Sequence, residues 1–322
     1  MVQREPEQFQ ELAVPVSPTH VQASTPEQVL SINESIHLSA ALVSHIAEES
    51  NIRVLLIKGP AATLVGARLQ RPSCDLDVLV DRPGMTLLLN ELERKGWEPR
   101  IHRVSEAFPD HSKTLLHPRW PSDIDVHWRF PGFYADESTV FELLWQSRQS
   151  VELGGRPAWT LSSNDALLVT LLHALRGPAS GVLEGDIAFC REKICISPKE
   201  HFDRASELGA LGPLSPVFAS IPETSVLDFR EPPLDWVLRT TAQRSATLRL
   251  FHLIEIPWHR KPAALLHALF PSRDSIGWHD LRLRHTNIWQ QFPHRVHRLW
   301  RSLSDSLQIL KEVREIRSRI QK

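Results

Sequence analysis

Hydrophobic positions in residues 27–50 recur at the spacing of a helix, and the pattern then changes to short continuous apolar runs. Residues 53–59 read RVLLIKG, a run rich in valine and leucine that ends at a glycine, as is typical of a buried strand. The sequence CDLDVLV at 74–80 predicts a second strand. Between them, Pro60 favours the first turn of a helix, where its missing N–H costs nothing.

The same alternation continues through the next fifty residues. PGMTLLLNELERKG predicts a helix that starts near Pro83 and stops at Gly96. Residues 97–104 and 112–117 suit further strands, and DIDVHW at 123–128 suits one more. Strand and helix in this order predict an α+β fold, built in layers around a mixed sheet.

After about residue 135 the pattern indicates helices. STVFELLWQSR, NDALLVTLLHALRG and much of 235–322 have helical spacing. The final helix is expected to carry an apolar stripe formed by Leu299, Leu303, Leu307, Leu310, Val313 and Ile320. We therefore expect a loosely ordered arm at 1–26, a core domain at 27–160 and a mainly helical C-terminal domain at 161–322.

Composition narrows the class of protein. The 322 residues are 42% hydrophobic and 23% charged, as in an ordinary soluble protein. The longest apolar run, ALLVTLL at 166–172, is far shorter than the roughly 20 residues that cross a bilayer. Three cysteines without an export signal predict a reducing, cytoplasmic location. From Trp236 onward, basic residues outnumber acidic ones, which permits a nucleic-acid partner, although solvated basic helices are commoner.

Two of the predicted strands carry acidic residues at alternate positions. Side chains at i and i+2 of a strand share a face, so Asp75 projects with Asp77, and Asp123 projects with Asp125 and His127. If the two strands are neighbours, several carboxylates converge, and they cannot all ionise without a cation. Oxygen ligands at this density suit Mg²⁺ or Mn²⁺. A solvated strand end is the alternative for each pair, and for Asp123 both interpretations stand.

The strand that ends at Gly59 offers a second chemical feature. A glycine followed at once by a helix start lets substrate approach the backbone, where free N–H groups favour phosphate. Lys58 can meet a phosphate as a point charge, or it can be an ordinary surface lysine at a strand end.

Taken together, these segments resemble a known superfamily. IKGPAATLVGARLQRPSCDLDVLV followed by IDVHW resembles the DNA polymerase β-like nucleotidyltransferases. It is most similar to the bacterial uncharacterised nucleotidyltransferase family, some members of which accompany lasso-peptide biosynthesis genes. The resemblance covers about residues 35–175. The matching positions are Lys58, Gly59, Arg71, Asp75, Asp77, Asp125, His127 and Trp128.

The resemblance implies an activity and roles for these residues. It implies a polymerase β-like core and Mg²⁺-dependent transfer of a nucleoside monophosphate from an NTP such as ATP to an acceptor hydroxyl, with release of pyrophosphate. The acceptor would be a small molecule, a peptide or a protein, and less readily a nucleic acid. Asp75, Asp77 and Asp125 would be catalytic and bind the metal, which is Mg²⁺ or Mn²⁺. The nucleotide would be bound by Lys58, Gly59, Arg71 and His127.

One position departs from the superfamily pattern. Pro60 stands where the superfamily has a serine or glycine after the first glycine, so it supplies neither a hydroxyl nor an N–H to the triphosphate. Lys58 or Arg71 is then expected to hold the phosphates. Arg71 has the alternative of pairing with Asp75, and His127 that of an ordinary strand histidine. The alternatives for the whole chain are a catalytically silent nucleotide- or partner-binding regulator and an RNA-modifying nucleotidyltransferase.

Overall fold

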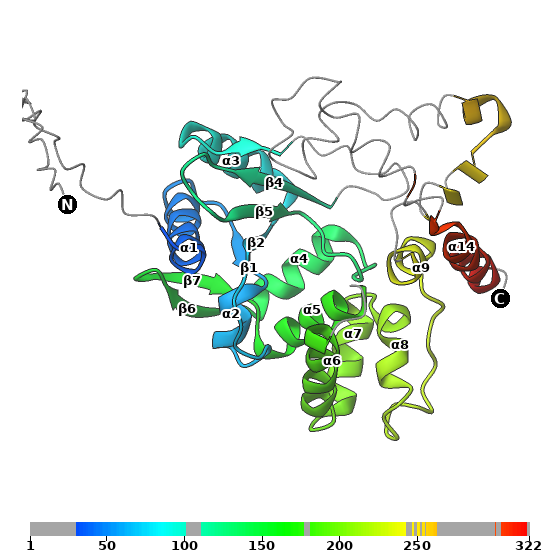
Figure 1. The fold of residues 1–322 in the computed structure, drawn as a ribbon. Coiled ribbons are helices and arrows are strands. Elements are labelled where there is room, and N and C mark those ends of the chain that lie inside the picture. Colours follow the sequence, from blue (N-terminus) through cyan, green and yellow to red (C-terminus); the bar gives the residue numbers. More distant parts are fainter. Residues whose placement is uncertain are drawn as a thin grey trace, which may run out of the picture.

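The computed structural model describes residues 30–100, 111–176 and 181–242, with residues 247, 250, 251, 253, 254, 256–262, 300 and 304–320. Figure 1 shows its helices and strands, coloured from the N-terminus to the C-terminus. The strands are β1 (Val54–Leu56), β2 (Asp75–Val80), β3 (Glu98–Pro99), β4 (Ser112–Leu116), β5 (Asp123–His127), β6 (Gln149–Leu153) and β7 (Arg156–Thr160). The helices are α1 (Ile32–Glu49), α2 (Gly59–Leu64), α3 (Arg82–Arg94), α4 (Glu137–Gln146), α5 (Ser163–Arg176), α6 (Gly181–Ile194), α7 (Pro198–Glu207), α8 (Leu211–Phe218), α9 (Leu234–Thr241), the 3₁₀ turn η1 (Trp258–Arg260) and α14 (Ser306–Ile320).

The described strands form one mixed sheet in the order β3-β4-β5-β2-β1-β7-β6. β2 pairs with β5 and β1 pairs with β7 in parallel, whereas the other pairs are antiparallel. The α+β prediction is confirmed, and so are the strands expected at 53–59, 74–80, 112–117 and 123–128. Of the strand expected at 97–104, two residues form β3, and residues 101–104 lie outside the described ones.

Helices cover both faces of the sheet (Figure 1). On one face, the even-numbered residues of β2 and β5 pack with α1 and α3 in a core that includes Leu76, Val78 and Val126. On the other face, Leu55 and Leu79 join a larger core with α4, α5 and α7. Alternation along a strand therefore directs the odd-numbered residues of β2 and β5 toward the α5 side.

The turns that flank β2 are fixed by local interactions. Gly59 opens α2 with a φ of +64°, a conformation that costs glycine little, and Pro60 follows it in the first turn. At the other end of β2, the Asp81 carboxylate caps α3 by accepting a hydrogen bond of 2.8 Å from the Gly84 amide. The predicted helix boundaries at Pro60 and Pro83 correspond to α2 and α3.

Residues 149–160 lie between two of the predicted helices, and no element was expected there. They form the hairpin β6–β7, whose turn is made by Gly154 and Gly155, both with positive φ. Two such residues suit the tight turn that joins twisted antiparallel strands. The hairpin extends the sheet because β7 pairs with β1 through Thr160 and Leu56.

The stripe predicted on the last helix is partly wrong. Leu307 is 82% exposed and Leu310 is 47% exposed, whereas Val313 is buried as predicted. The buried face of α14 is the neighbouring one, with Ile309 and Ile316, because α14 packs against α9. Leu299 and Leu303 of the predicted stripe, and the side chain of Ile320, lie outside the described residues.

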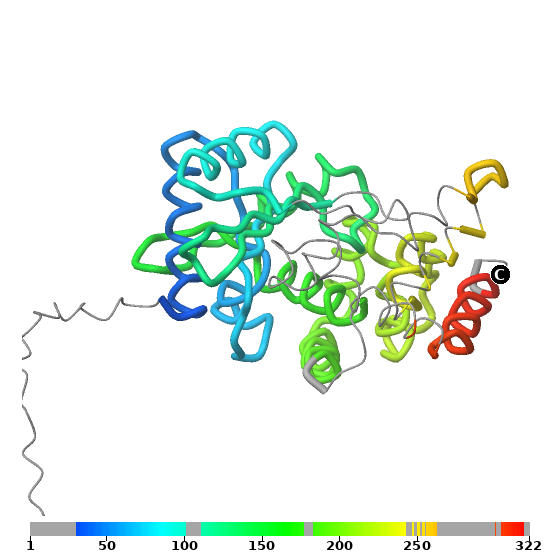
Figure 2. The backbone as a smooth tube through the Cα atoms, turned by 45° about the horizontal axis from the view of Figure 1, so that its top comes forward, coloured from blue at the N-terminus to red at the C-terminus, as the bar shows by residue number. Residues whose placement is uncertain are grey.

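The described elements after Thr160 are helical, and α14 lies at the opposite end of the molecule from α1 (Figure 2). The larger core contains residues of both the sheet and these helices. The division into domains at 27–160 and 161–322 stays a proposal, and the arm at 1–26 lies outside the described residues. Within the described part of the chain, no helix combines the length and apolar character needed to span a membrane.

Candidate functional site

The pairing of β2 with β5 brings the acidic residues of the two strands together. The parallel register sets Asp75 beside Asp123 and Asp77 beside Asp125. Because alternate residues share a face, all four side chains belong to the α5 side of the sheet. The condition on which the sequence prediction depended, that the two strands are neighbours, is therefore met.

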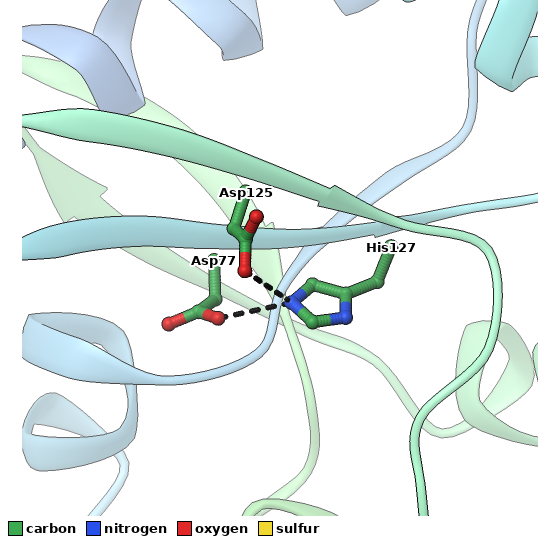
Figure 3. A group of neighbouring side chains, drawn as sticks. All are labelled: Asp77, Asp125 and His127. Carbon is green, nitrogen blue, oxygen red and sulfur yellow. Dashed lines mark hydrogen bonds and ion pairs between the residues drawn. The ribbon is translucent and has the colours of Figure 1, made fainter. Parts of the chain in front are cut away.

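His127 joins the two central carboxylates (Figure 3). Its Nε2 lies 3.0 Å from Oδ1 of Asp77 and 3.5 Å from Oδ2 of Asp125. Asp77 and His127 are buried, with 4% and 1% exposed. Ligand atoms of the three residues all lie within 4.8 Å of one another. His127 is thus in contact with the acidic pair, and its alternative as an ordinary strand histidine does not describe its position.

Lys58 lies against Asp77. Its Nζ is 2.5 Å from Oδ1 of Asp77, and its side chain is 16% exposed, so it is not a surface lysine. Burial opposes ionisation of Asp77, but the Lys58 ammonium and the hydrogen bond from His127 outweigh it and hold the pKa of Asp77 below its ordinary value. Asp77 is therefore a carboxylate held at the centre of the site by the Lys58 ammonium and the His127 imidazole.

Asp125 has a neutral partner that the sequence did not reveal. Thr114 lies opposite it in the antiparallel register of β4 and β5, and the Thr114 hydroxyl donates a hydrogen bond of 2.5 Å to Oδ1 of Asp125. Burial raises the pKa of Asp125, but the His127 and Thr114 hydrogen bonds more than offset it, so the net pKa is lowered. Asp125 therefore stays ionised at neutral pH.

The two outer aspartates differ from this pair. Burial and the charge of Asp77 raise the pKa of Asp75 to about 6. Asp123 forms an ion pair with Arg100, and burial raises its pKa despite that partner. The ionised form of Asp75 is therefore less stabilised than those of Asp77 and Asp125, while Asp123 is paired with Arg100 at the edge of the site.

Arg71 is held by a residue that is distant in the sequence. Both of its terminal nitrogens bond to Asp186 of α6, which is fully buried, with Nη2 at 2.5 Å from Oδ2. The expected alternative of a pair with Asp75 is wrong, because Asp186 holds the guanidinium in a bidentate pair. No local signal in the sequence connects two residues 115 positions apart.

Gly59 lies at the entrance to α2 beside the loop that leads to β2. A Cβ at residue 59 would lie 3.3 Å from Oγ of Ser73. That loop is braced by Arg68, which donates to Oγ of Ser73 at 2.9 Å and to the carbonyl of Pro72 at 3.1 Å. Gly59 thus combines a left-handed backbone with a close neighbour, which leaves little room for any other residue.

A cavity of about 110 Å³ lies near the ends of β2 and β5, and none of the four aspartates lines it. Leu79 contributes to its wall and lies beside His127 in the register of β2 and β5. The remaining wall is mostly aromatic, from Trp128, Phe130, Phe133, Tyr134 and Phe141.

The donor set fits a hard divalent cation. Carboxylate oxygens of Asp77 and Asp125, with Asp75 adjacent, are the ligands that Mg²⁺ and Mn²⁺ prefer. Like charges that repel one another gain from a cation, and in its absence Lys58 and His127 compensate Asp77. A metal ion at Oδ1 of Asp77 would therefore take the place of the Lys58 ammonium.

Comparisons with known proteins identify the family of this chain. Residues 19–180 match the profile of a family described as uncharacterised nucleotidyltransferase. No curated protein matches the sequence.

Among solved structures, a lincosamide antibiotic adenylyltransferase with lincomycin bound is 17% identical, with 48% of this chain and 94% of that chain covered and a TM-score of 0.33. An antigenic nucleotidyltransferase-like protein from Paracoccidioides brasiliensis is 17% identical over 60% and 91%, with a TM-score of 0.37. A tRNA nucleotidyltransferase in complex with a primer tRNA and an ATP analogue is 14% identical over 87% and 97%, with a TM-score of 0.25.

Proposed function

This chain belongs to the uncharacterised nucleotidyltransferase family, and on that premise we propose that it transfers a nucleoside monophosphate from an NTP to a hydroxyl of a small-molecule, peptide or protein acceptor. The observation that carries the proposal is the parallel register of β2 and β5, which sets Asp77 beside Asp125 with His127 against both. Three free cysteines, two of them exposed, are compatible with the reducing cytoplasm as its location.

The reaction is a substitution at phosphorus. The acceptor oxygen forms a bond to the α-phosphorus of the NTP, the bond from that phosphorus to the bridging oxygen breaks, and pyrophosphate leaves with the bonding electrons. The hydroxyl proton goes to a carboxylate of the site. Asp125 is our choice for this role, since it is ionised at neutral pH and is oriented by the Thr114 hydroxyl.

Asp75, Asp77 and Asp125 would hold one or two Mg²⁺ or Mn²⁺ ions. Such ions stabilise the charge of the attacking and leaving oxygens and neutralise the triphosphate. Asp77 supplies a fully ionised carboxylate for this purpose. Asp75, with its raised pKa, is the carboxylate that gains most from a nearby cation.

Lys58 and His127 have roles that follow from their present contacts. Lys58 lies 2.5 Å from Asp77, and if Asp77 held a metal ion the flexible Lys58 side chain would be free to bind the phosphates. His127 keeps Asp77 and Asp125 in place through Nε2. Gly59 gives the nucleotide close access to the backbone, and Arg71, fixed by Asp186, adds a positive charge at the side of the site.

A transfer assay tests the proposal. Purified protein is incubated with Mg²⁺, each radiolabelled NTP in turn and fractions of a bacterial extract, and pyrophosphate release and labelled products are measured. We expect both signals with at least one NTP, and we expect their loss in Asp77→Asn and Asp125→Asn. The control is Asp203→Asn, which removes an exposed acid of α7 that pairs with Lys199.

Other results would point to other functions. Tight nucleotide binding that EDTA does not change, without transfer in any fraction, would favour the silent regulator. Label on RNA, with binding that weakens steeply as salt rises, would favour the RNA-modifying alternative. The absence of both binding and transfer with every NTP tested would contradict the proposal as a whole.

A further inference from the structure

Arg176, the last residue of α5, points its guanidinium toward the site. The guanidinium lies 4.9 Å from the centre of the Phe130 ring. That ring is 6.2 Å from the ring of His127, which contacts both carboxylates. Arg176 therefore lies on the α5 side of the sheet, one aromatic ring away from the Asp77 and Asp125 pair.

The polar partner of Arg176 is a neutral side chain. Its Nη2 lies 3.4 Å from Nδ1 of His173, one turn earlier in α5. A guanidinium can only donate, so Nδ1 accepts and the imidazole carries its proton on Nε2. Burial, helped by the charge of Lys58, lowers the pKa of His173 to about 3, in agreement with a neutral ring. His173 thus orients the arginine without compensating its charge.

The other cations near the carboxylates are committed elsewhere. Lys58 is paired with Asp77 and Arg71 with Asp186, while Arg68 is bonded to the loop before β2. Among the residues that the structure describes, Arg176 makes no ion pair with a carboxylate at salt-bridge distance. A partly buried charge without a counterion is costly, and it is kept in a protein where an anion binds.

The surroundings of Arg176 add positive charge. Burial and then the charge of Arg239 lower the pKa of Arg176 to about 10, while the smaller effects of the charges of Asp77 and Asp125 act in the opposite direction. The ring of His111, tilted by 43° and 5.7 Å from the ring of His127, also lies within range of the charges of Arg176 and Arg239, and burial together with these charges lowers its pKa. α9, which carries Arg239, packs against α5. Arg176 thus lies within range of a second arginine, Arg239, as well as of the two carboxylates.

The position of Arg176 at the end of α5 offers a purely structural explanation. Cations at a helix C-terminus are stabilised by the helix dipole. Contact with the Phe130 ring adds a further stabilisation. If these two effects were the whole reason for the residue, its loss would lower the stability of the protein and leave phosphate binding unchanged.

From this geometry, and resting on the proposed function, we infer that Arg176 binds the phosphate tail of the NTP and the pyrophosphate that leaves, with His173 as its positioning residue. The planar guanidinium suits two oxygens of one phosphate. Its place on the α5 side of the sheet, within range of the charges of Asp77 and Asp125, puts the leaving group between the metal-binding oxygens and a fixed positive charge. Arg176 would then replace Arg71 as the main arginine for the triphosphate.

Tripolyphosphate is the probe that tests this role without chemistry. Its binding in the presence of Mg²⁺ is measured by calorimetry for the wild type, Arg176→Gln, Arg176→Lys and the control Arg148→Gln. Arg148 is matched to Arg176 because it also lies over aromatic rings, those of Trp145 and Trp159. We expect roughly 10-fold or greater weakening in Arg176→Gln, a smaller loss in Arg176→Lys and no change in the control.

Two further readouts separate the explanations. Mn²⁺ binding, followed by electron paramagnetic resonance, is expected to be the same in Arg176→Gln and the wild type. The melting temperature of Arg176→Gln without ligand is expected to equal or exceed that of the wild type, because the variant removes a charge that lacks a counterion. Tripolyphosphate at one fixed concentration is then expected to raise the melting temperature of Arg176→Gln less than that of the wild type and of the control.

The outcomes distinguish this inference from the function on which it rests. If the wild type and Arg176→Gln bind tripolyphosphate equally, the inference is overturned and the proposed function stands. A lower melting temperature with unchanged affinity would identify the structural explanation as correct. If the wild type transfers no nucleotide and binds no tripolyphosphate, the proposed function itself fails.

Discussion

Replacing Asp75 by asparagine is expected to stabilise the metal-free protein while removing its activity. Asp75 is partly buried beside the charge of Asp77, and its pKa is raised from the ordinary 3.8 to about 6. Ionising this side chain at neutral pH therefore costs free energy that an uncharged amide of the same shape does not. Active sites commonly trade stability for function in this way.

The size and sign of the effect follow from proton linkage. Because the folded pKa lies above the unfolded one, the contribution of Asp75 to stability is complete below pH 3.8 and is lost as the pH rises through about 6. A difference of about 2 pKa units corresponds to an upper limit of about 3 kcal/mol at pH 7. Since the side chain is partly exposed, we expect about 1 to 3 kcal/mol, or a few degrees in melting temperature.

Urea unfolding in EDTA, from pH 4 to 7, measures this difference for Asp75→Asn, the wild type and the control Asp203→Asn. The advantage of Asp75→Asn is expected to be small near pH 4 and to grow up to pH 7, while the control follows the wild type. Saturating Mg²⁺ is expected to narrow or reverse the gap, since the ion binds the wild-type carboxylate more tightly. A variant that is less stable than the wild type at pH 7, or a gap that does not change with pH, would refute the reasoning.

Three other predictions concern the metal, the backbone and the packing of the helices. Chelation with EDTA is expected to abolish nucleotide transfer, and Mg²⁺ or Mn²⁺ in excess is expected to restore it; transfer that persists after exhaustive chelation would contradict the metal-dependent proposal. Gly59→Ala is expected to lower the free energy of unfolding by roughly 1 to 2 kcal/mol, because φ at residue 59 is +64°; unchanged urea unfolding would show that this turn relaxes freely. Asp165→Asn is expected to lower the free energy of unfolding by about 3 kcal/mol, because Asp165 is fully buried and pairs with Arg204 at 2.7 Å. The control is Asp203→Asn, which breaks the exposed pair of Asp203 with Lys199. An equally small loss of stability in both variants would argue against a structural role for the buried pair.

Local patterns in the sequence were sufficient to predict the faces of the strands but not their partners. In 74–80 and 123–128, the aspartates occupy alternate positions, so each strand has its aspartates on one face, because strand geometry repeats every two residues. That β2 and β5 are adjacent, parallel and in matching register is a property of the whole sheet. The resemblance to a known family implied that these aspartates share a metal site, but neither it nor the residues alone gave the direction and register of the pairing.

Partners distant in the sequence explain most of what was not foreseen. Thr114 reaches Asp125 through the pairing of β4 with β5, and Asp186 reaches Arg71 from a helix beyond the sheet. Neither contact leaves a local trace. The β6–β7 hairpin is different, since Gly154 and Gly155 between two short strands are a turn signal that the helical pattern around them obscured.

The last helix shows the limit of periodicity. Leucines at 307 and 310 have helical spacing, but α14 buries the adjacent face because its partner is α9. When leucine, isoleucine and valine occur on more than one face of a helix, the packing partner decides which face is buried.

Mn²⁺ binding tests the central claim most directly, since that claim is that aspartates of two adjacent parallel strands share a divalent ion. Free Mn²⁺ is measured by electron paramagnetic resonance during titration of the wild type, Asp77→Asn, Asp125→Asn and the control Asp203→Asn. We predict that each of the two site variants weakens binding by roughly 10-fold or more, as for loss of a metal ligand, and that the control does not. Affinity equal to that of the wild type in both Asp77→Asn and Asp125→Asn would contradict the claim.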